Sequence, residues 1–387
     1  MVKLGKVTVI YTGTGFPKEL QGCKEGKYPF YKVGDISKNV LAGYKKLMLC
    51  DNYIEEGAVK KIKGKILPKD TVVFAKIGEA VKLNRRAITT KECLVDNNVM
   101  GIAPVKSFMD INYLYYYMSF VKLENLAEAT TVPSVKKGMI EDLEIDLPTL
   151  DTQRIISNII SEVDDLILLI NKQLDDLNVI VKSRFVELFL QANESFPKKK
   201  LGECTVINPK KSMDTRLKED LIVSFVPMAS VGEDGSIDTS EKKLYREVKS
   251  GFTYFIEGDV LFAKITPCME NGKGAVAINL YNGIGFGSTE FHVIRPLEGF
   301  TNPVWLYNLS VSKKFRLEAE ANMTGSAGQK RTPASFLQNY EIKLPPIELQ
   351  NQFADFAEQV DKSKLAIQQS LDELETLKKS LMQQYFG

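Results

Sequence analysis

Apolar residues recur at alternating spacings of four and three along two long stretches of the chain, and each stretch predicts a long amphipathic helix. The first series runs from Ile156 to Leu188 and is interrupted by Arg184. The second contains Lys364 and Lys378, which predict a weaker seam. Such a seam needs an apolar partner, which its own domain or the other helix can supply. The predicted seam residues are Ile156, Ile160, Val163, Ile167, Ile170, Leu174, Leu177, Val360, Ile367, Leu371 and Leu374.

The two helical stretches are copies of one another. An offset of 197 residues places Ile145 on Ile342 and Gln153 on Gln350, and a Leu-Pro pair lies between the two positions in both copies. Proline is well tolerated just ahead of a helix, where its missing N–H costs little, and an acidic residue near the start suits the positive end of the helix dipole. Because both copies occur in one chain, they can pair with each other.

The rest of the chain forms two β-rich segments that are also related. The strand-like run Phe74–Ile77 recurs letter for letter as Phe262–Ile265, and the aromatic run Tyr113–Phe120, which predicts a short core helix, has a counterpart beginning at Trp305. Between these anchors the segments differ, as two domains with different ligands would. The sequence therefore predicts an α+β chain with β-rich domains at residues 1–144 and 192–341 and long repeated helices at residues 145–191 and 342–387.

Composition narrows the class of protein. At 387 residues the chain is long enough for two or more domains, and 44% hydrophobic and 26% charged residues are ordinary for a globular protein. No run of 18 apolar residues predicts a membrane span. The five cysteines are scattered and unpaired in sequence, which favours reduced thiols and a cytoplasmic location.

Charge suggests where a polyanion would bind. The net charge is only +2, but Lys and Arg are in excess on the β-rich segments and Asp and Glu on the helices. A polar loop precedes each helix, at residues 130–137 and 324–332, and it is interpreted as a nucleic-acid contact or as a flexible connector. The candidates for phosphate contact are Lys76, Lys136, Lys137, Lys264, Lys330 and Arg331, and those for closer contact with the groove are Thr131, Ser134, Ser326 and Gln329.

Catalytic chemistry is not evident in the sequence. The single histidine, His292, aligns with Met100 of the other half, so nothing that the duplication preserves depends on it. A pair of histidines for acid–base work or zinc binding is therefore excluded, and no glycine-rich phosphate-binding motif is present. We predict a chain without catalytic residues, bound metal or cofactor.

Two variable halves, each with a Phe-Ala-Lys-Ile strand and each ending in Ile-x-Leu-Pro, four residues, Gln and a heptad helix, resemble the DNA-specificity subunit of type I restriction–modification systems. The resemblance covers the whole chain. It implies an antiparallel coiled coil of the two helices and an internal pseudo-twofold. It also implies that each domain reads one half of a split, asymmetric target in double-stranded DNA.

The resemblance further implies partners that carry the chemistry. Two modification subunits would methylate adenine from S-adenosylmethionine, and two restriction subunits in the full complex would use ATP and Mg. The helix repeats would bind the modification subunits, and no membrane would be involved. Two other hypotheses stay open from the residues alone: a coiled-coil scaffold with two protein-binding domains, and an independent nuclease or methyltransferase.

Overall fold

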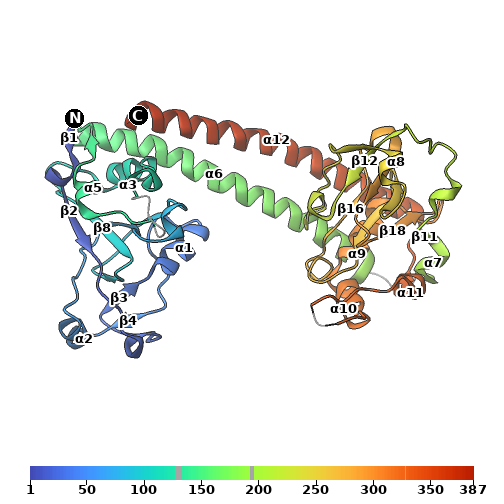
Figure 1. Cartoon of the computed structure of the whole chain (residues 1–387), viewed down its shortest axis with the longest axis horizontal. Coiled ribbons are helices and arrows are strands. Elements are labelled where there is room, and N and C mark those ends of the chain that lie inside the picture. The colour runs from blue at the N-terminus through green and yellow to red at the C-terminus, as the bar shows by residue number, and fades with distance from the viewer. Residues whose placement is uncertain (128–132, 192–195, 327) are drawn as a thin grey trace. The chain divides into compact units, whose positions relative to one another are not determined.

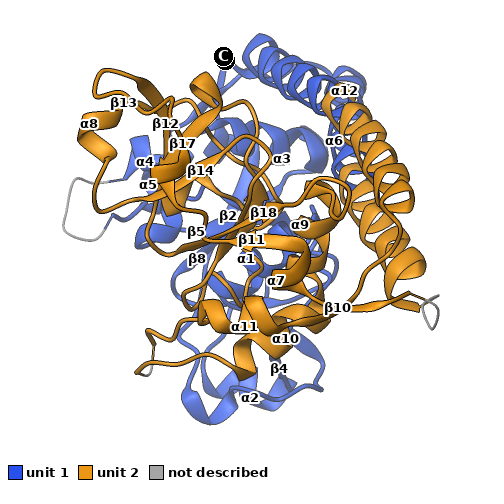
Figure 2. Cartoon of the chain, turned by 90° about the vertical axis from the view of Figure 1, so that its right-hand side faces the viewer, with its two compact units in different colours: residues 1–173, 367–387 blue, residues 174–366 orange. Residues whose placement is uncertain are grey.

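The computed structural model describes residues 1–127, 133–191, 196–326 and 328–387. The chain forms two compact units, which Figure 2 shows in different colours. Unit 1 contains residues 1–173 and 367–387, and unit 2 contains residues 174–366. Each unit therefore combines one β-rich region with part of both long helices, α6 (Leu150–Phe185) and α12 (Ile347–Phe386), which are labelled in Figure 1.

The main sheet of unit 1 is antiparallel, with strand order β2-β8-β5-β6. Its strand β5 is apolar on both faces: Val72 and Phe74 belong to the core beneath α3, and Val73 belongs to a second core on the other face. A strand buried on both faces reads as a continuous apolar run rather than an alternating one. The strands are β2 (Thr8–Thr12), β5 (Val72–Ala75), β6 (Arg86–Ile88) and β8 (Val99–Pro104).

The aromatic run of unit 1 is the core helix α3 (Ile111–Phe120), as the sequence predicts. Asp110 caps its start, because its carboxylate accepts hydrogen bonds from the backbone N–H groups of Asn112 and Tyr113. Around the sheet and α3 lie β1 (Val2–Lys3), η1 (Leu4–Lys6), η2 (Lys18–Leu20), β3 (Tyr28–Tyr31), α1 (Val33–Leu41), β4 (Tyr53–Ile54), α2 (Glu56–Lys61), η3 (Glu79–Val81), β7 (Leu94–Val95), α4 (Leu123–Leu126), α5 (Lys137–Glu141) and β9 (Glu144–Ile145).

Unit 2 repeats this architecture. Its antiparallel sheet has the order β11-β18-β15-β16, and its strand β15 is again buried on both faces, with Phe262 in one core and Leu261 in another. The helix α9 (Pro303–Val311) takes the place of α3, and Asn302 caps it as Asp110 caps α3. The sheet strands are β11 (Thr205–Ile207), β15 (Val260–Ala263), β16 (Gly274–Val276) and β18 (Phe291–Pro296).

The second sheets of the two units differ. In unit 1 it has the order β4-β3-β7, and in unit 2 the order is β13-β12-β17-β14. Both contain one parallel pair, β3 with β7 and β12 with β17. The remaining elements of unit 2 are β10 (Lys198–Lys200), α7 (Leu201–Cys204), η5 (Lys211–Met213), β12 (Ile222–Val226), η6 (Met228–Ser230), β13 (Lys242–Leu244), α8 (Tyr245–Val248), β14 (Thr253–Ile256), η7 (Tyr281–Gly283), β17 (Ile284–Gly287), α10 (Lys313–Ala321), α11 (Ala334–Asn339) and β19 (Glu341–Lys343).

The long helices pack against each other within each unit in the antiparallel sense. In unit 1 the beginning of α6, with Ile156 and Ile160, shares a core with Met382 near the end of α12. In unit 2 the end of α6 meets the beginning of α12, where Phe185 lies edge-on to Phe353 at 5.4 Å between ring centroids. The predicted α+β chain with two β-rich regions and paired long helices is confirmed.

The seam residues face inward to different degrees. At the end of α6, Phe185 takes the buried position of the seam while Arg184 stays exposed, because the helix widens into the π-helical turn η4 (Val186–Gln191). Ile156, Ile160, Val163, Val360 and Leu371 are buried, and Ile167, Ile170, Leu174, Leu177, Ile367 and Leu374 are half-buried.

Candidate nucleic-acid interface

The polar loop of unit 1 lies against the end of the repeated strand. The backbone carbonyl of Lys76 accepts a hydrogen bond from Val135 at 2.8 Å, and the N–H of Gly78 donates to the carbonyl of Pro133 at 2.9 Å. Ile77 and Ser134 thereby form an antiparallel bridge. The loop is therefore fixed to the continuation of β5 and is not a free connector over its described residues.

Unit 2 makes the same contacts with different side chains. The carbonyl of Lys264 accepts from Thr332 at 2.9 Å, Thr266 donates to the carbonyl of Lys330 at 3.1 Å, and Ile265 bridges Arg331. Arg331 therefore occupies in unit 2 the position that Ser134 occupies in unit 1, at the offset of 197 residues that relates the long helices. The same backbone pairing between strand and loop therefore holds loops of different sequence in the two units. We call this repeated pairing the strand–loop frame.

The structure gives Arg331 a partner within the chain. Its guanidinium binds the carboxylate of Glu290 through two hydrogen bonds of 2.8 and 2.9 Å. This hydrogen-bonded pair is the main reason that the pKa of Glu290 is lowered. Arg331 is therefore oriented by Glu290, and its predicted contact with phosphate stays a prediction.

The loop of unit 2 ends in an exposed turn. Thr324 and Arg331 exchange two backbone hydrogen bonds, of 2.8 and 3.0 Å, and the N–H of Gln329 donates to the carbonyl of Ser326 at 3.0 Å. Gly325 has φ of +124°, and a Cβ there would lie 2.8 Å from the carbonyl oxygen of Gln329, so only glycine fits. Ser326, Gln329 and Lys330 are exposed on this turn.

The remaining candidates are placed as follows. Lys76 and Lys264 are half-buried at the ends of β5 and β15, and Lys136 and Lys137 are exposed at the start of α5. Lys137 lies 3.3 Å from Glu141 in an exposed pair, which contributes little to stability. Thr131 lies outside the described residues. The backbone pairing thus places Lys76 next to Ser134 in unit 1 and Lys264 next to Arg331 in unit 2, and the other described candidates lie further along the same two loops.

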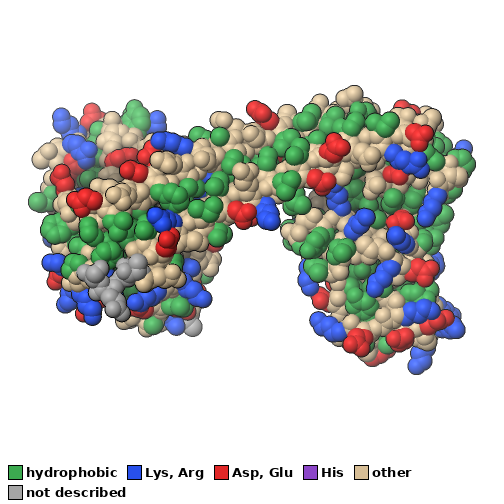
Figure 3. Space-filling model, turned by 180° about the vertical axis from the view of Figure 1, so that it is seen from behind, with side chains coloured by type: hydrophobic (Ala, Val, Ile, Leu, Met, Phe, Trp, Pro, Cys, Tyr) green, Lys and Arg blue, Asp and Glu red, His purple; other side chains and the backbone are tan. Residues whose placement is uncertain are grey.

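Charge alone does not outline the interface. On the face shown in Figure 3, Lys and Arg side chains are interspersed with Asp and Glu side chains over each unit.

His292 lies buried in unit 2, where Nε2 is 2.8 Å from the carbonyl oxygen of Thr332, and burial lowers its pKa. Among the described residues no cluster of three or more His, Cys, Asp or Glu side chains could hold a metal ion. A helix that could span a bilayer is likewise absent from the part of the chain that the structure describes.

The glutamine of the repeated Leu-Pro, four residues, Gln pattern has a structural role that the sequence did not reveal. Gln153 is fully buried, and its Oε1 accepts a hydrogen bond from the backbone N–H of Asp110 at 2.8 Å. Its Nε2 donates to the carbonyls of Phe108 and Pro148, both at 2.9 Å. One side chain therefore joins the first turn of α6 to the start of α3.

Gln350 makes the matching contacts in unit 2. It is also fully buried, accepts from the N–H of Asn302 at 2.9 Å, and donates to the carbonyls of Phe300 and Pro345, both at 2.9 Å. The fixed spacing from proline to glutamine in both copies was the signal in the sequence. We call this repeated arrangement the glutamine latch.

A polar cluster joins both long helices to the β-rich region of unit 1. The carboxylate of Asp164 lies 2.6 Å from Nζ of Lys378 and 3.2 Å from Nζ of Lys45, and it accepts a hydrogen bond from Tyr116 Oη at 2.9 Å. Burial alone would raise the pKa of Asp164, but these partners outweigh burial and lower it. Lys378 of α12 thus forms an ion pair with Asp164 of α6, so its place in the apolar seam of α12 has a structural reason.

Unit 2 keeps part of this arrangement. Asp361 stands at the position of Asp164, and Tyr307 at that of Tyr116. Burial and the negative charges of Asp234 and Asp361 raise the pKa of Tyr307 to about 12. Lys364, the other lysine of the predicted seam, pairs with Asp361 at 2.9 Å on its own helix.

Comparison with known proteins identifies the family. The model of the type I restriction modification DNA specificity domain matches residues 1–179 and again residues 193–376. The type I restriction enzyme EcoAI specificity subunit of Escherichia coli is 44% identical over 146 residues, which cover 37% of this chain and 24% of that protein. The MjaVIII specificity subunit of Methanocaldococcus jannaschii is 25% identical over 325 residues, 76% of this chain and 73% of that protein.

A solved structure has the same fold. The type I restriction–modification S subunit from M. genitalium aligns over 100% of this chain and 95% of its own, with a TM-score of 0.53 and 15% sequence identity. The duplicated matches at residues 1–179 and 193–376 coincide with the two strand–loop frames and the two glutamine latches. The chain therefore belongs to the type I restriction modification DNA specificity family.

Proposed function

We propose that this chain is the non-catalytic subunit that reads a split, asymmetric DNA target, one half with each unit. The repeated strand–loop frame carries the proposal, because Ser134 and Arg331 occupy the same backbone position with different chemistry. A shared frame would present each loop to DNA in the same way, while different side chains would select different base pairs. The two half-sites should therefore differ in sequence.

The chemistry would belong to partner subunits. Two modification subunits would bind this chain and methylate adenine from S-adenosylmethionine, and two restriction subunits would join the full complex with ATP and Mg. Family membership supports this proposal, and so does the duplication, because two equivalent copies of one helix offer two equivalent binding surfaces. A flipped adenine would enter the pocket of the modification subunit.

Sequencing of methylated adenines tests the proposal. The chain would be expressed with the modification subunit encoded beside it, in a host without other adenine methylation, and modified positions would be mapped over the genome. We expect a split motif with two different halves, present only when this chain is present. Methylation that is unchanged without the chain would reject the proposal and favour a protein-binding scaffold.

Two substitutions in the exposed turn of unit 2 separate affinity from specificity. We expect Lys330→Ala to weaken binding similarly for all sequences and to reduce the slope of log affinity against log salt by about 1, because one phosphate contact is lost. We expect Gln329→Ala to relax discrimination at one base pair of one half-site by roughly 1–3 kcal/mol. Fluorescence anisotropy with duplexes that differ at single positions measures both effects.

A matched control is Lys362→Ala, on the exposed side of α12 in the same unit, where the lysine pairs with Glu358. It should change neither the salt slope nor the preference for any base. If Gln329→Ala alters both half-sites equally, the assignment of one half-site to each unit is wrong.

A further inference from the structure

Glu290 of unit 2 and Asn98 of unit 1 occupy the same position beside the strand–loop frame. The backbone carbonyl of Glu290 accepts a hydrogen bond from the N–H of Lys264 at 2.9 Å. In unit 1 the carbonyl of Asn98 accepts from the N–H of Lys76 at 2.8 Å. Each residue also comes directly before the strand that pairs with the repeated Phe-Ala-Lys-Ile run, β18 in unit 2 and β8 in unit 1. The duplication therefore relates Glu290 to Asn98, as it relates Arg331 to Ser134.

These two positions carry no net charge in either unit. Unit 2 has an ion pair, Glu290 with Arg331, and unit 1 has two uncharged polar residues, Asn98 and Ser134. Phosphate contact depends on positive charge and carries no information about sequence, so we would expect a cation in both units if it were the role of this position. A guanidinium, an amide and a hydroxyl instead share the ability to hydrogen-bond to base edges in the major groove. The comparison favours contact with bases over contact with phosphate.

The hydrogen bonds of Arg331 hold one edge of its guanidinium. Its Nε and Nη2 donate to the two carboxylate oxygens of Glu290 at 2.9 and 2.8 Å, and its Nη1 donates to the carbonyl of Gln329 at 3.3 Å. Because a guanidinium has five N–H groups, one on Nη1 and one on Nη2 have no acceptor among the described residues. The side chain is 42% exposed, and the bond of Nη1 lies at the surface whereas those to Glu290 are partly buried.

An arginine held in this way suits a guanine. Guanine presents two acceptors, O6 and N7, on its major-groove edge, and an arginine that offers two N–H groups binds both. The carboxylate of Glu290 fixes the plane of the Arg331 guanidinium and offsets its charge. The pair therefore gains little from a phosphate, whereas directional hydrogen bonds to a base gain from the fixed plane. Lys330, which is exposed on the same turn, remains the candidate for phosphate contact.

We propose that Arg331 reads a guanine in the half-site of unit 2 and that Glu290 is the residue that positions its guanidinium for this contact. The inference rests on the proposed function, in which unit 2 reads one half of the target. Ser134 and Asn98 take the same place in unit 1, where a hydroxyl and an amide select a different base pair. Glu290 lies outside the loop that carries Arg331, so the specificity of this loop depends on a residue at the start of β18.

Two variants test the roles of the pair in the complex of this chain with the modification subunit. The target is taken from the map of methylated adenines, and fluorescence anisotropy measures affinity for duplexes in which its G·C pairs are replaced by A·T one at a time. Arg331→Gln with Glu290→Gln keeps the net charge. We expect this double variant to reduce discrimination at one G·C pair of one half-site by roughly 5- to 100-fold and to leave the salt slope unchanged.

The single variant Glu290→Gln isolates the positioning role. We expect it to reduce discrimination at the same G·C pair, because the guanidinium is no longer held by a carboxylate. We also expect it to steepen the slope of log affinity against log salt by about 1, because the charge of Arg331 is no longer offset and can meet a phosphate. An ion pair with only a structural role would produce neither change.

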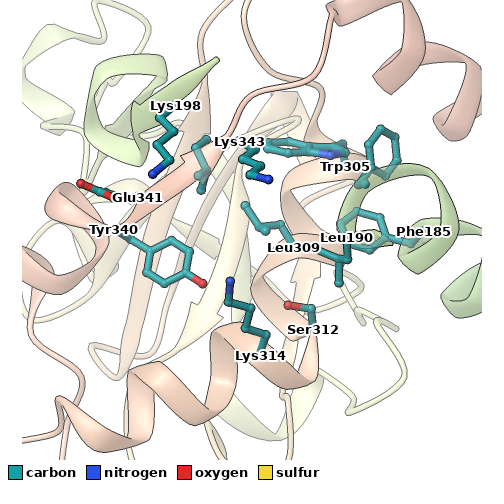
Figure 4. Close-up of a pocket in the computed structure, with 12 residues that line it drawn as sticks. Phe185, Leu190, Lys198, Trp305, Leu309, Ser312, Lys314, Tyr340, Glu341 and Lys343 are labelled. Atoms are coloured by element: carbon teal, nitrogen blue, oxygen red, sulfur yellow. The ribbon is translucent and has the colours of Figure 1, made fainter. Parts of the chain in front are cut away.

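The controls concern charge and folding. Lys362→Gln with Glu358→Gln removes an exposed ion pair from α12 in the same unit and should change neither discrimination nor the salt slope. Trp305 lies in the core of unit 2 and lines a pocket together with Phe185 (Figure 4). Because it is the only tryptophan of the chain, its fluorescence during urea denaturation shows whether each variant keeps unit 2 folded.

The outcomes separate this inference from the proposed function. A double variant that keeps every base preference and reduces the salt slope by about 1 would overturn the inference and assign Arg331 to a phosphate. A double variant that changes neither quantity would also overturn it, because the ion pair would then be structural only. An unaltered chain whose complex shows no sequence preference would instead refute the proposed function.

Discussion

Replacing Gln350 with alanine is expected to lower the free energy of unfolding of unit 2 by about 3 kcal/mol. The substitution removes three hydrogen bonds, to the N–H of Asn302 and to the carbonyls of Phe300 and Pro345, at a site that is fully buried. Each buried group left without a partner costs about 1–3 kcal/mol, and water that enters the space left by the side chain recovers part of this loss.

The position of the only tryptophan makes this effect measurable for one unit. Trp305 lies in the core of unit 2, so its fluorescence during urea denaturation reports on that unit. Gln350→Ala should shift the fluorescence transition to lower urea concentration. Gln352→Ala, two residues along α12 and exposed, should change stability by less than about 0.5 kcal/mol.

The equivalent substitution in unit 1 completes the comparison. Gln153→Ala should destabilise unit 1 to a similar extent, as seen by hydrogen exchange in peptides from residues 150–173, because Gln153 makes the same three contacts. If Gln350→Ala and Gln352→Ala shift the fluorescence transition equally, the hydrogen bonds of the glutamine latch do not contribute to the stability of unit 2.

Replacing Asp164 with asparagine is expected to loosen the contact between α6 and α12 in unit 1 by about 2 kcal/mol at neutral pH. The change keeps the size of the side chain but leaves Lys378 and Lys45 without their main carboxylate. Breaking a buried ion pair costs 3–5 kcal/mol or so, and the partial exposure of both lysines reduces that figure. Hydrogen exchange in peptides from residues 367–387 measures the effect.

The pH dependence identifies the charge as the cause. The pKa of Asp164 is lower in the folded protein than its ordinary value of about 3.9, so its stabilising contribution is complete above that value and declines as the pH falls through the folded pKa. The difference between the native chain and Asp164→Asn should therefore shrink below about pH 4. A difference that does not vary with pH would indicate packing and not charge.

The neighbouring carboxylate provides the control for this experiment. Asp165 is exposed and lies 3.8 Å from Lys45, so Asp165→Asn should have little effect. The double variant Asp164→Asn with Lys378→Met should lose less stability than the sum of the single changes, because removing both charges avoids an unpaired buried group.

The sequence by itself determined the duplication and the kinds of element in this protein. Its apolar periodicity specified two long helices, and the repeated Phe-Ala-Lys-Ile run specified a buried strand in each half, because both signals are local and depend on spacing along the chain. The recurrence of Gln153 as Gln350, at a fixed spacing from proline, identified the two helices as copies. It did not show what the two glutamines bind, because their partners, the segments around Asp110 and Asn302, are distant in sequence.

Only the tertiary structure decided how these elements are shared between compact units. The sequence divides the chain into domains and helices in order, whereas each unit takes part of α6 and part of α12, since the two ends of each helix are buried in different cores. In the sequence Lys378 interrupts an apolar seam, whereas in the folded chain it pairs with Asp164, which also accepts a hydrogen bond from Tyr116. The periodicity of one helix predicts which of its residues face inward, but the charged partners of those residues come from other segments of the chain.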